Sequence, residues 1–322
     1  MVKRILVTGS EGFVGRHVRR ALTRAGAEVV GIDMPGCGAE IGCDLSDPRV
    51  SPEELVASVG PVAGIVHLAA RITRTSSVDA GARRNVRVIA EVPVRLMEAW
   101  NQRYGPTHLV FCSSIKVYGA QARLPIAPDA SPLRPEPNSY GSAKALGERL
   151  LEVSRLRGLG TCAIVRPSYV YGPGQRATTA IPSFLRTCWQ GMQPIVFGDG
   201  RQLRDDVLAS DVAYCLTEAC VRRVEGAFNA GGERVRCLLD VAELCCRAVE
   251  AVGGPRGLSP ALDATRAPAP WVDQSFDSSR TRVLLDYEPA PLLEGLMRQA
   301  RWMRDGADTA RAVEYTWADG RR

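Results

Sequence analysis

A tyrosine and a lysine stand four residues apart, at Tyr140 and Lys144, in a segment with a helical pattern. Side chains at this spacing lie on one face of a helix. A phenol with a pKa of about 10 is a poor base at neutral pH, but a neighbouring ammonium stabilises the phenolate. Such a pair can remove a proton from a hydroxyl group, and Ser114, at the end of an earlier predicted strand, can hydrogen-bond the same oxygen. We therefore interpret Ser114, Tyr140 and Lys144 as catalytic candidates; the alternative is a Tyr/Lys pair on an exposed helix.

A glycine triplet lies between the first predicted strand, residues 3–8, and a predicted helix, residues 13–24. Its spacing is G-x-x-G-x-x-G. The glycines permit a tight turn and allow backbone N–H groups to approach a pyrophosphate, and the helix directs its positive end at that anion. The triplet is weak evidence alone and strong evidence in this position. We predict a dinucleotide site that includes Gly9, Gly12, Phe13, Val14 and Gly15, whose nicotinamide charge would help Lys144 to acidify Tyr140.

Asp33 ends the second predicted strand, residues 27–33. A carboxylate there can accept hydrogen bonds from both ribose hydroxyls of an adenosine and would repel a 2′-phosphate, so it favours NAD over NADP. The alternative is a turn residue. Asp44 and Leu45 stand where a loop could close over the adenine, although Asp44 also fits turn chemistry.

The elements that must position these residues alternate between strand and helix. Further strands are predicted at residues 64–70, 108–113 and 161–166, and further helices at residues 86–104 and 140–158. This alternation predicts βαβ units and a parallel sheet covered on both faces. We therefore expect an α/β protein with a Rossmann doubly wound parallel sheet and a smaller C-terminal substrate-binding lobe.

The alternation stops after Arg166. Residues 167–205 are rich in Pro and Gly, residues 253–275 contain four prolines, and helices are predicted at residues 211–223 and 239–252. The expected division is an NAD-binding domain of residues 1–166, to which residues 205–230 return. Residues 167–204 and 231–304 would form the substrate-binding lobe, and residues 305–322 a tail.

Composition excludes several classes of function. The chain has 322 residues, of which 45% are hydrophobic and 24% charged, as in ordinary soluble proteins. Its net charge of +6 is spread along the sequence, so we expect no nucleic-acid partner. No apolar run is long enough to cross a membrane, and the first residues lack a signal peptide. The ten cysteines form no C-x-x-C pair, which indicates reduced thiols, no metal site and a cytoplasmic location.

Together these motifs resemble the extended short-chain dehydrogenase/reductases, in particular the NDP-sugar epimerase/dehydratase family. They run in the family's order over residues 2–232. The matching segments are 8–15, Asp33, 67–70, Asn85, 113–119, Tyr140, Lys144, 166–167, 169–174, 198–200 and 204–207.

The resemblance implies further site residues. It places Ser114, rather than Ser113, at the catalytic position, and it implies a homodimer. The cofactor contacts that it adds are Leu68, Ala69, Ala70, Asn85, Pro167 and Val170, besides Tyr140 and Lys144. The substrate contacts are Ser114, Tyr169 facing the sugar, Val196 and Phe197 near the nucleobase, and Arg204 on the diphosphate.

The residues that directly follow Ser114 limit the reactions that we expect. Family dehydratases carry an Asp-Glu pair directly after the catalytic residue, and decarboxylases a Glu two residues after it. Here these positions hold Ile115 and Lys116, which disfavours both reactions. The remaining prediction is an NAD-dependent epimerase that acts on a nucleotide-diphosphate sugar at C4 through a transient 4-keto sugar. An NAD(P)-dependent sugar dehydrogenase or 4-ketoreductase and a non-catalytic dinucleotide-binding sensor stay open. Lys116 could meet an anionic substrate group such as a uronate, or be an exposed loop lysine.

Overall fold

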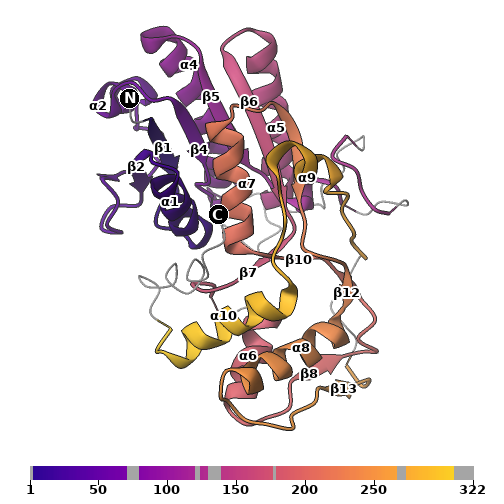
Figure 1. The fold of residues 1–322 in the computed structure, drawn as a ribbon. Helices are drawn as coiled ribbons and strands as arrows, with labels where there is room; N and C mark the ends of the chain where they lie inside the picture. Colours follow the sequence, from indigo (N-terminus) through magenta and orange to yellow (C-terminus); the bar gives the residue numbers. More distant parts are fainter. Residues whose placement is uncertain are drawn as a thin grey trace.

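The computed structural model describes residues 3–70, 80–119, 124–129, 139–176, 179–266 and 273–307. Its centre is a seven-stranded sheet in the order β11-β6-β5-β4-β1-β2-β3, in which every neighbouring pair is parallel (Figure 1). The strand order runs outward from β1 in both directions, which confirms the predicted doubly wound sheet. The strands are β1 (Arg4–Thr8), β2 (Glu28–Asp33), β3 (Ile41–Gly42), β4 (Gly64–His67), β5 (Thr107–Cys112), β6 (Gly160–Pro167) and β11 (Gly226–Ala230).

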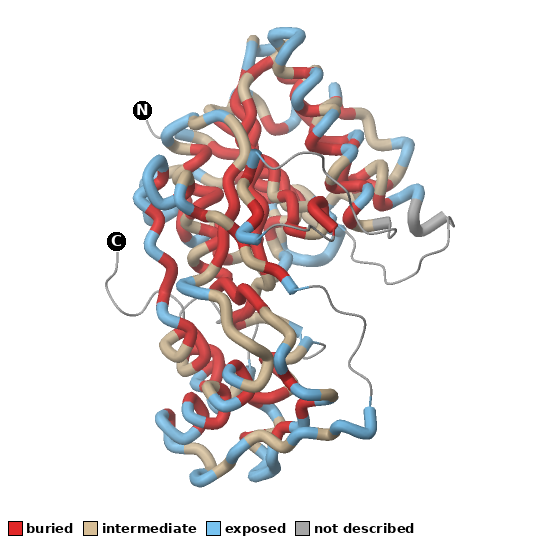
Figure 2. The backbone as a smooth tube through the Cα atoms, turned by 90° about the vertical axis from the view of Figure 1, so that its right-hand side faces the viewer, coloured by how far each residue is buried: buried red, intermediate tan, exposed pale blue. Residues whose placement is uncertain are grey.

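Helices cover both faces of this sheet because successive strand residues point to opposite sides. On one face Leu6 and Ile65 pack with α2 (Pro52–Val59), α4 (Val92–Tyr104) and α5 (Ser139–Leu156). On the other face Val7 and Val66 pack with α1 (Phe13–Arg24) and α7 (Ala209–Val221). Figure 2 shows the buried backbone concentrated between these layers.

The helix predicted at residues 86–104 is longer than expected and is interrupted. It begins as α3 (Ala80–Val86), passes through a π-helical turn, η1 (Arg87–Glu91), and continues as α4. Pro93 lies in the first turn of α4. A proline has no backbone N–H to donate within a helix, and insertion of an extra residue per turn is one way to accommodate it.

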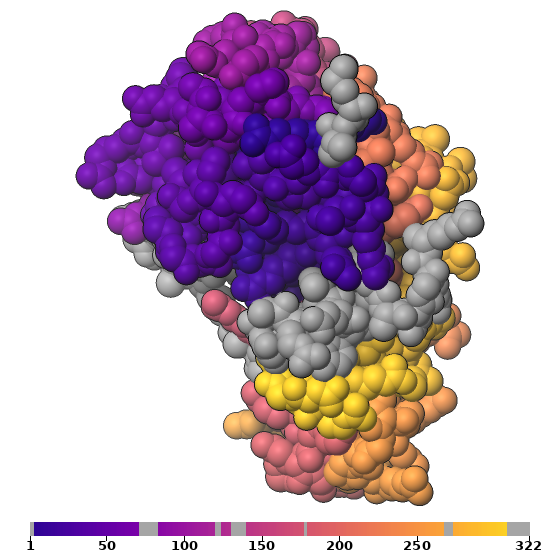
Figure 3. Space-filling view, turned by 60° about the vertical axis from the view of Figure 1, so that its left-hand side comes forward, coloured from indigo at the N-terminus to yellow at the C-terminus, as the bar shows by residue number. Residues whose placement is uncertain are grey.

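The C-terminal lobe has a core of its own. It is formed by α6 (Ala180–Trp189), α8 (Leu238–Ala251) and α10 (Leu292–Arg304). Two small sheets border it: β8 (Ile195–Phe197) with β13 (Ala261–Asp263), and β9 (Leu203–Arg204) with β12 (Arg236–Cys237). In Figure 3 this part, in orange and yellow, lies below the indigo N-terminal part. Between the two parts, β7 (Tyr169–Tyr171) pairs with β10 (Asp206–Leu208).

One segment of the expected lobe belongs with the sheet instead. Helix α9 (Ser279–Leu285) contacts β11 and α7, and Leu285 and Tyr287 are buried in the core on the α7 face. The chain therefore returns to the sheet a second time, which the sequence pattern does not predict. The tail predicted at residues 305–322 lies mostly outside the described residues, which end at Ala307. Within the described part of the chain, no helix is both long and apolar enough to cross a membrane.

Candidate active site

The glycine loop joins β1 to α1 in a conformation that only small residues permit. Gly9 has a φ of +72°, and its N–H donates to the Ile32 carbonyl at 2.8 Å. A Cβ atom on Gly15 would lie 2.0 Å from the Gly9 oxygen. Helix α1 starts at Phe13 with Gly12 as N-cap and without a capping side chain, so the first-turn N–H groups, including that of Val14, suit an anion. This cradle fits the pyrophosphate of a dinucleotide.

The carboxyl ends of three strands meet at this loop. The carboxylate of Asp33, the last residue of β2, accepts the Glu11 N–H at 2.8 Å. Ala69, after β4, lies so close that a Cβ on Gly9 would approach its nitrogen to 2.7 Å. Ala70 follows as an exposed residue. The structure thus brings together the residues predicted for the pyrophosphate and for the ribose.

Other predicted cofactor residues surround this edge of the sheet. Asp44 accepts the Ser46 N–H at 2.9 Å and the Ser46 hydroxyl at 2.7 Å, which is the turn chemistry given as its alternative role. The Leu45 side chain is buried in the sheet core, so only its backbone can meet a ligand. The remaining predicted residues are half-buried Leu68 after β4, buried Asn85 in α3, buried Pro167 at the end of β6 and half-buried Val170 in β7.

Ser114, Tyr140 and Lys144 come together at the carboxyl end of β5. Ser114 follows this strand and caps the short 3₁₀ turn η2 (Ile115–Val117). Tyr140 lies in the first turn of α5, and its hydroxyl is hydrogen-bonded to Ser114. Lys144 is 1% exposed, its Nζ lies 5.8 Å from the centre of the Tyr140 ring, and it donates to the Cys112 carbonyl. This is the arrangement that the spacing predicts.

Burial shifts the pKa values of both Tyr140 and Lys144. Burial raises the pKa of Tyr140, and the hydrogen bond from Ser114 opposes this shift. Burial also lowers the pKa of Lys144 to about 8. In the protein alone, the cost of desolvating the phenolate therefore determines the direction of the Tyr140 shift, and a lowering by Lys144 together with the nicotinamide charge stays a prediction. Further positive charge is needed beside the ring, and an oxidised nicotinamide carries it.

A buried ion pair behind this cluster was not predicted. Arg166 Nε and Nη2 donate to the Glu148 carboxylate at 3.0 and 2.6 Å, and Nη1 donates to the Tyr118 hydroxyl at 2.7 Å. The Ser113 hydroxyl also donates to Glu148. Because Ser113 is held in this way, Ser114 is the serine that faces Tyr140. Glu148 follows Lys144 by four residues on the same helix face, and this was the signal that could have found it.

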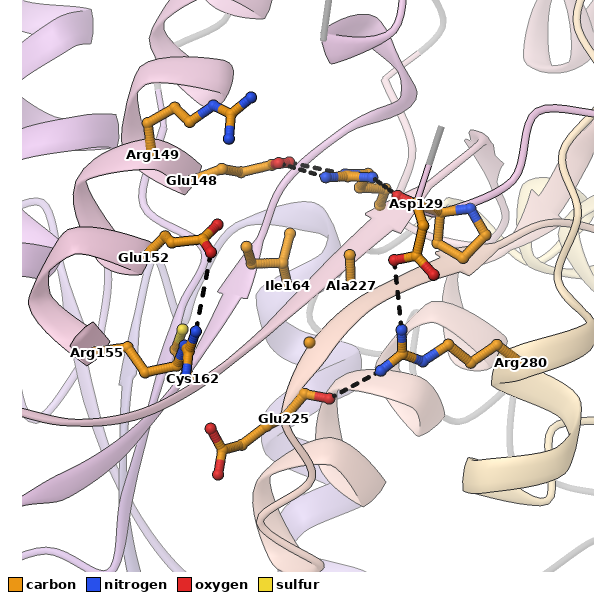
Figure 4. Close-up of a pocket in the computed structure, with 13 residues that line it drawn as sticks. Asp129, Glu148, Arg149, Glu152, Arg155, Cys162, Ile164, Glu225, Ala227 and Arg280 are labelled. Atoms are coloured by element: carbon orange, nitrogen blue, oxygen red, sulfur yellow. Dashed lines mark hydrogen bonds and ion pairs between the residues drawn. The ribbon is translucent and has the colours of Figure 1, made fainter. Parts of the chain in front are cut away.

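A cavity of 440 Å³ lies on the far side of that ion pair, between α5, β6, β11 and the start of α9 (Figure 4). Its wall includes opposite charges that pair with each other, such as Arg155 with Glu152 at 3.8 Å and Arg280 with Asp129 at 3.5 Å. The cavity lies at the β6–β11 edge, and β5 and β4 separate this edge from β1. It is therefore not the dinucleotide site.

The predicted sugar and diphosphate residues meet on β7 and beside it. The Arg204 guanidinium lies 4.8 Å from the centre of the Tyr169 ring. It also donates to the Asp206 carboxylate at 3.0 and 2.6 Å and so belongs to a buried ion pair. Val196 is 1% exposed, and its side chain is part of the core of the C-terminal lobe. The predicted contact with the nucleobase would therefore have to come from its backbone. Phe197 is 39% exposed, and the Arg266 guanidinium lies 5.0 Å from the centre of its ring.

We expect Gly15→Ala to release the cofactor. The new Cβ would collide with the Gly9 backbone, which cannot move aside as a side chain can, so α1 must shift away from the loop. Overpacking of this kind costs about 1–3 kcal/mol. The expected result is a lower unfolding temperature and at least tenfold weaker NAD binding, measured by calorimetry.

Gly36→Ala is the matched control for this variant. Its φ of +83° strains an alanine, but its Cβ would meet nothing within 4 Å. We expect a loss of stability of about 1–2 kcal/mol with unchanged NAD affinity. Equal NAD affinity in Gly15→Ala and the unsubstituted protein would show that the cradle does not hold the pyrophosphate.

Comparisons with known proteins agree with this geometry. Residues 5–231 match the model of the NAD dependent epimerase/dehydratase family. A dTDP-4-dehydro-6-deoxy-D-allose reductase from a Streptomyces species is 30% identical, over 93% of this chain and 96% of that protein. A UDP-glucose 4-epimerase from Mycolicibacterium smegmatis is 30% identical, over 94% of this chain and 99% of that protein.

A solved structure has the same fold. The structure titled MoeE5 in complex with UDP-glucuronic acid and NAD is 28% identical, covers 94% of this chain and 99% of its own, and superposes with a TM-score of 0.75. The family model covers the glycine loop, the Ser114–Tyr140–Lys144 cluster and the segment from Arg166 to Asp206. The chain therefore belongs to the NAD-dependent epimerase/dehydratase family.

Proposed function

We propose that the chain is an NAD-dependent epimerase that inverts C4 of a nucleotide-diphosphate sugar through a transient 4-keto sugar. The observation that carries this proposal is the cluster of buried Ser114, partly buried Tyr140 and buried Lys144 at the same edge of the sheet as the glycine loop. The epimerases among its relatives, including those from Mycolicibacterium smegmatis and Azospirillum brasilense, support the reaction class.

The residues divide the work as follows. Tyr140 accepts the proton of the C4 hydroxyl when C4 is oxidised and returns it when C4 is reduced, and Ser114 hydrogen-bonds the same oxygen. Lys144 holds positive charge beside the Tyr140 ring. The glycine loop and Asp33 would hold NAD, which when bound would supply the hydride acceptor and donor for C4, so that no net oxidation would occur. Ile115 and Lys116 provide no carboxylic acid for elimination, which disfavours dehydration of the sugar.

A second candidate is a 4-ketoreductase. It is favoured by one observation, the named reductase from Streptomyces that matches 93% of the chain. A reductase consumes one reduced nicotinamide for each product, whereas an epimerase regenerates its cofactor in each cycle. The two candidates therefore differ in whether product forms without added cofactor.

The test is to incubate the purified protein, with its bound nucleotide, with UDP-, GDP- and dTDP-sugars, in both their 4-hydroxy and their 4-keto forms, and to identify products by NMR. We expect the C4 epimer to form without added cofactor and without a lasting change in the absorbance of reduced nicotinamide. Turnover that stops when added NADH or NADPH is withheld would support the reductase instead. No product in either condition would remove both candidates and favour a dinucleotide sensor.

The proposal extends to assembly and location. The outer face of α5 exposes Leu146, Val153 and Leu156, at 42%, 52% and 70% of their surfaces. Their spacing of seven and three residues places them on one side of the helix. This stripe supports a homodimer formed through α5.

All ten cysteines are free in the structure, which supports a cytoplasmic location.

A further inference from the structure

Lysine is rare in this chain, and two of its lysines stand at the active site. Of the 41 basic residues, only Lys3, Lys116 and Lys144 are not arginine. Lys116 lies two residues after Ser114 in the 3₁₀ turn η2, and its backbone N–H donates to the Ser114 hydroxyl oxygen at 3.2 Å. The turn therefore fixes the Lys116 backbone beside Ser114, whose hydroxyl would bind the C4 oxygen together with Tyr140.

The Lys116 side chain is half-buried and directed toward the predicted sugar site. Its ammonium lies 5.7 Å from the centre of the Tyr169 ring, and the Arg204 guanidinium lies 4.8 Å from the same centre. Two cations thus share one ring. Arg204 forms its ion pair with Asp206, and the Asp205 carboxylate accepts the Gly232 N–H at 2.6 Å.

The chemistry of a hexose determines what Lys116 can meet. C1, which carries the diphosphate, and C4 lie opposite each other across the ring, so a cation beside the C4 oxygen is remote from the phosphates. The neighbours of C4 are C3, with a hydroxyl group, and C5, with the C6 group. C6 is a neutral hydroxymethyl group in a simple hexose and a carboxylate in a uronic acid.

We propose that Lys116 binds the C6 carboxylate of a nucleotide-activated uronic acid, and that this sugar class is the substrate. The inference rests on the proposed function, because it uses the C4 oxygen to place the sugar. An ammonium is a compact charge with three N–H donors, and it bonds a carboxylate more strongly than a hydroxyl group. Partial burial strengthens that preference by reducing the screening from water.

UDP-glucuronic acid and UDP-glucose provide the test, because they differ only at C6. The kcat and KM of the NAD-loaded protein are measured for both sugars in four forms: unsubstituted, Lys116→Met, Lys116→Arg and Lys3→Met. We expect Lys116→Met to lower kcat/KM for the uronate by about 10- to 100-fold, mainly through KM, and that for UDP-glucose by less than about threefold. Lys116→Arg should restore part of the preference. Lys3 is exposed and precedes β1, so Lys3→Met should leave kcat/KM unchanged for both sugars.

Two results would overturn the proposal while leaving the epimerase intact. One is a preference of the unsubstituted protein for UDP-glucose, and the other is an equal loss for both sugars in Lys116→Met, which would mean that Lys116 only shapes the Ser114 turn. If neither sugar is epimerised, the proposed function fails. The affinities of the two sugars, measured by calorimetry, then test Lys116 separately. Equal affinity of the unsubstituted protein for both sugars would show that Lys116 does not bind the C6 carboxylate.

Discussion

Tyr140→Phe should lower kcat by about 1,000-fold or more while the protein keeps its NAD. The substitution removes only the hydroxyl group that accepts the C4 proton, and general acid–base catalysis contributes about 10²–10⁴-fold. The ring remains in its place beside Lys144, so folding and cofactor binding should persist. Epimer formation followed by NMR gives kcat, and the nucleotide released on denaturation gives the bound NAD.

Tyr104→Phe is the control for this variant. Tyr104 ends α4, is 40% exposed and should be dispensable. Ser114→Ala should cost less than Tyr140→Phe, about 10- to 100-fold, because it removes one hydrogen bond to the substrate oxygen and leaves the proton acceptor. If Tyr140→Phe kept more than a tenth of the activity, another group would have to accept the proton, and the proposed chemistry would be wrong.

The parallel sheet was predictable because its strands carry a strong local pattern. The strands β1, β2, β4, β5 and β6 are short, mainly apolar runs, whereas the two-residue strand β3 has no such pattern and is not predicted. The exceptions depend on tertiary contacts. Strand β11 is short, and only its pairing with β6 makes it part of the sheet. Helix α9 packs against β11 and α7, far from its neighbours in sequence.

The catalytic cluster was predictable for a similar reason, since Tyr140 and Lys144 are related by helix spacing and Ser114 ends a strand. The direction of the Tyr140 pKa shift was not predictable from the sequence, because it depends on how deeply the fold buries the phenol. The pairing of Glu148 with Arg166 was not predicted either. It joins a helix to a strand that follows it, and sequence spacing alone does not show which buried acid meets which base.

The fold should also be unusually sensitive to acid, because all three histidines are buried. His17 lies in α1, His67 in β4 and His108 in β5, each with 0% of its surface exposed. Burial is the main cause that lowers their pKa values, to about 4 for His17, about 3 for His67 and about 4 for His108. In the unfolded chain the histidines bind protons near pH 6.5, whereas in the native protein they stay neutral until the pH approaches 4.

The hydrogen bonds agree with neutral rings. The Nε2 atoms of His67 and His108 lie 2.9 and 3.1 Å from the carbonyl oxygens of Val88 and Ala219. A carbonyl only accepts, so Nε2 carries the hydrogen in both rings. In His67 the other nitrogen, Nδ1, lies 2.8 Å from the Thr8 hydroxyl, which can donate to it. Neutral rings satisfy these bonds without placing charge in the sheet core.

The pH window follows from these values. As pH falls below 6.5, the unfolded state takes up protons that the native state excludes, so stability falls by about 1.4 kcal/mol per pH unit for each histidine. At pH 5 the three histidines together cost about 6 kcal/mol. Asp205 acts in the opposite direction, because burial raises its pKa to about 6, and it offsets about 1 kcal/mol. The net loss is comparable with the whole stability of many domains, about 5–15 kcal/mol.

Urea unfolding at pH 7.5, 6 and 5, followed by circular dichroism, measures this dependence. His108→Gln is the informative variant, because the amide can still donate to the Ala219 carbonyl but cannot titrate. It should lower stability at pH 7.5 and also reduce the net loss of about 5 kcal/mol between pH 7.5 and 5 by about 2 kcal/mol, since one of three similar groups no longer contributes. A purely structural effect of the substitution would lower the free energy of unfolding equally at all three pH values. Stability that is flat between pH 7.5 and 5 in the unsubstituted protein would show that the histidines are not held neutral by burial.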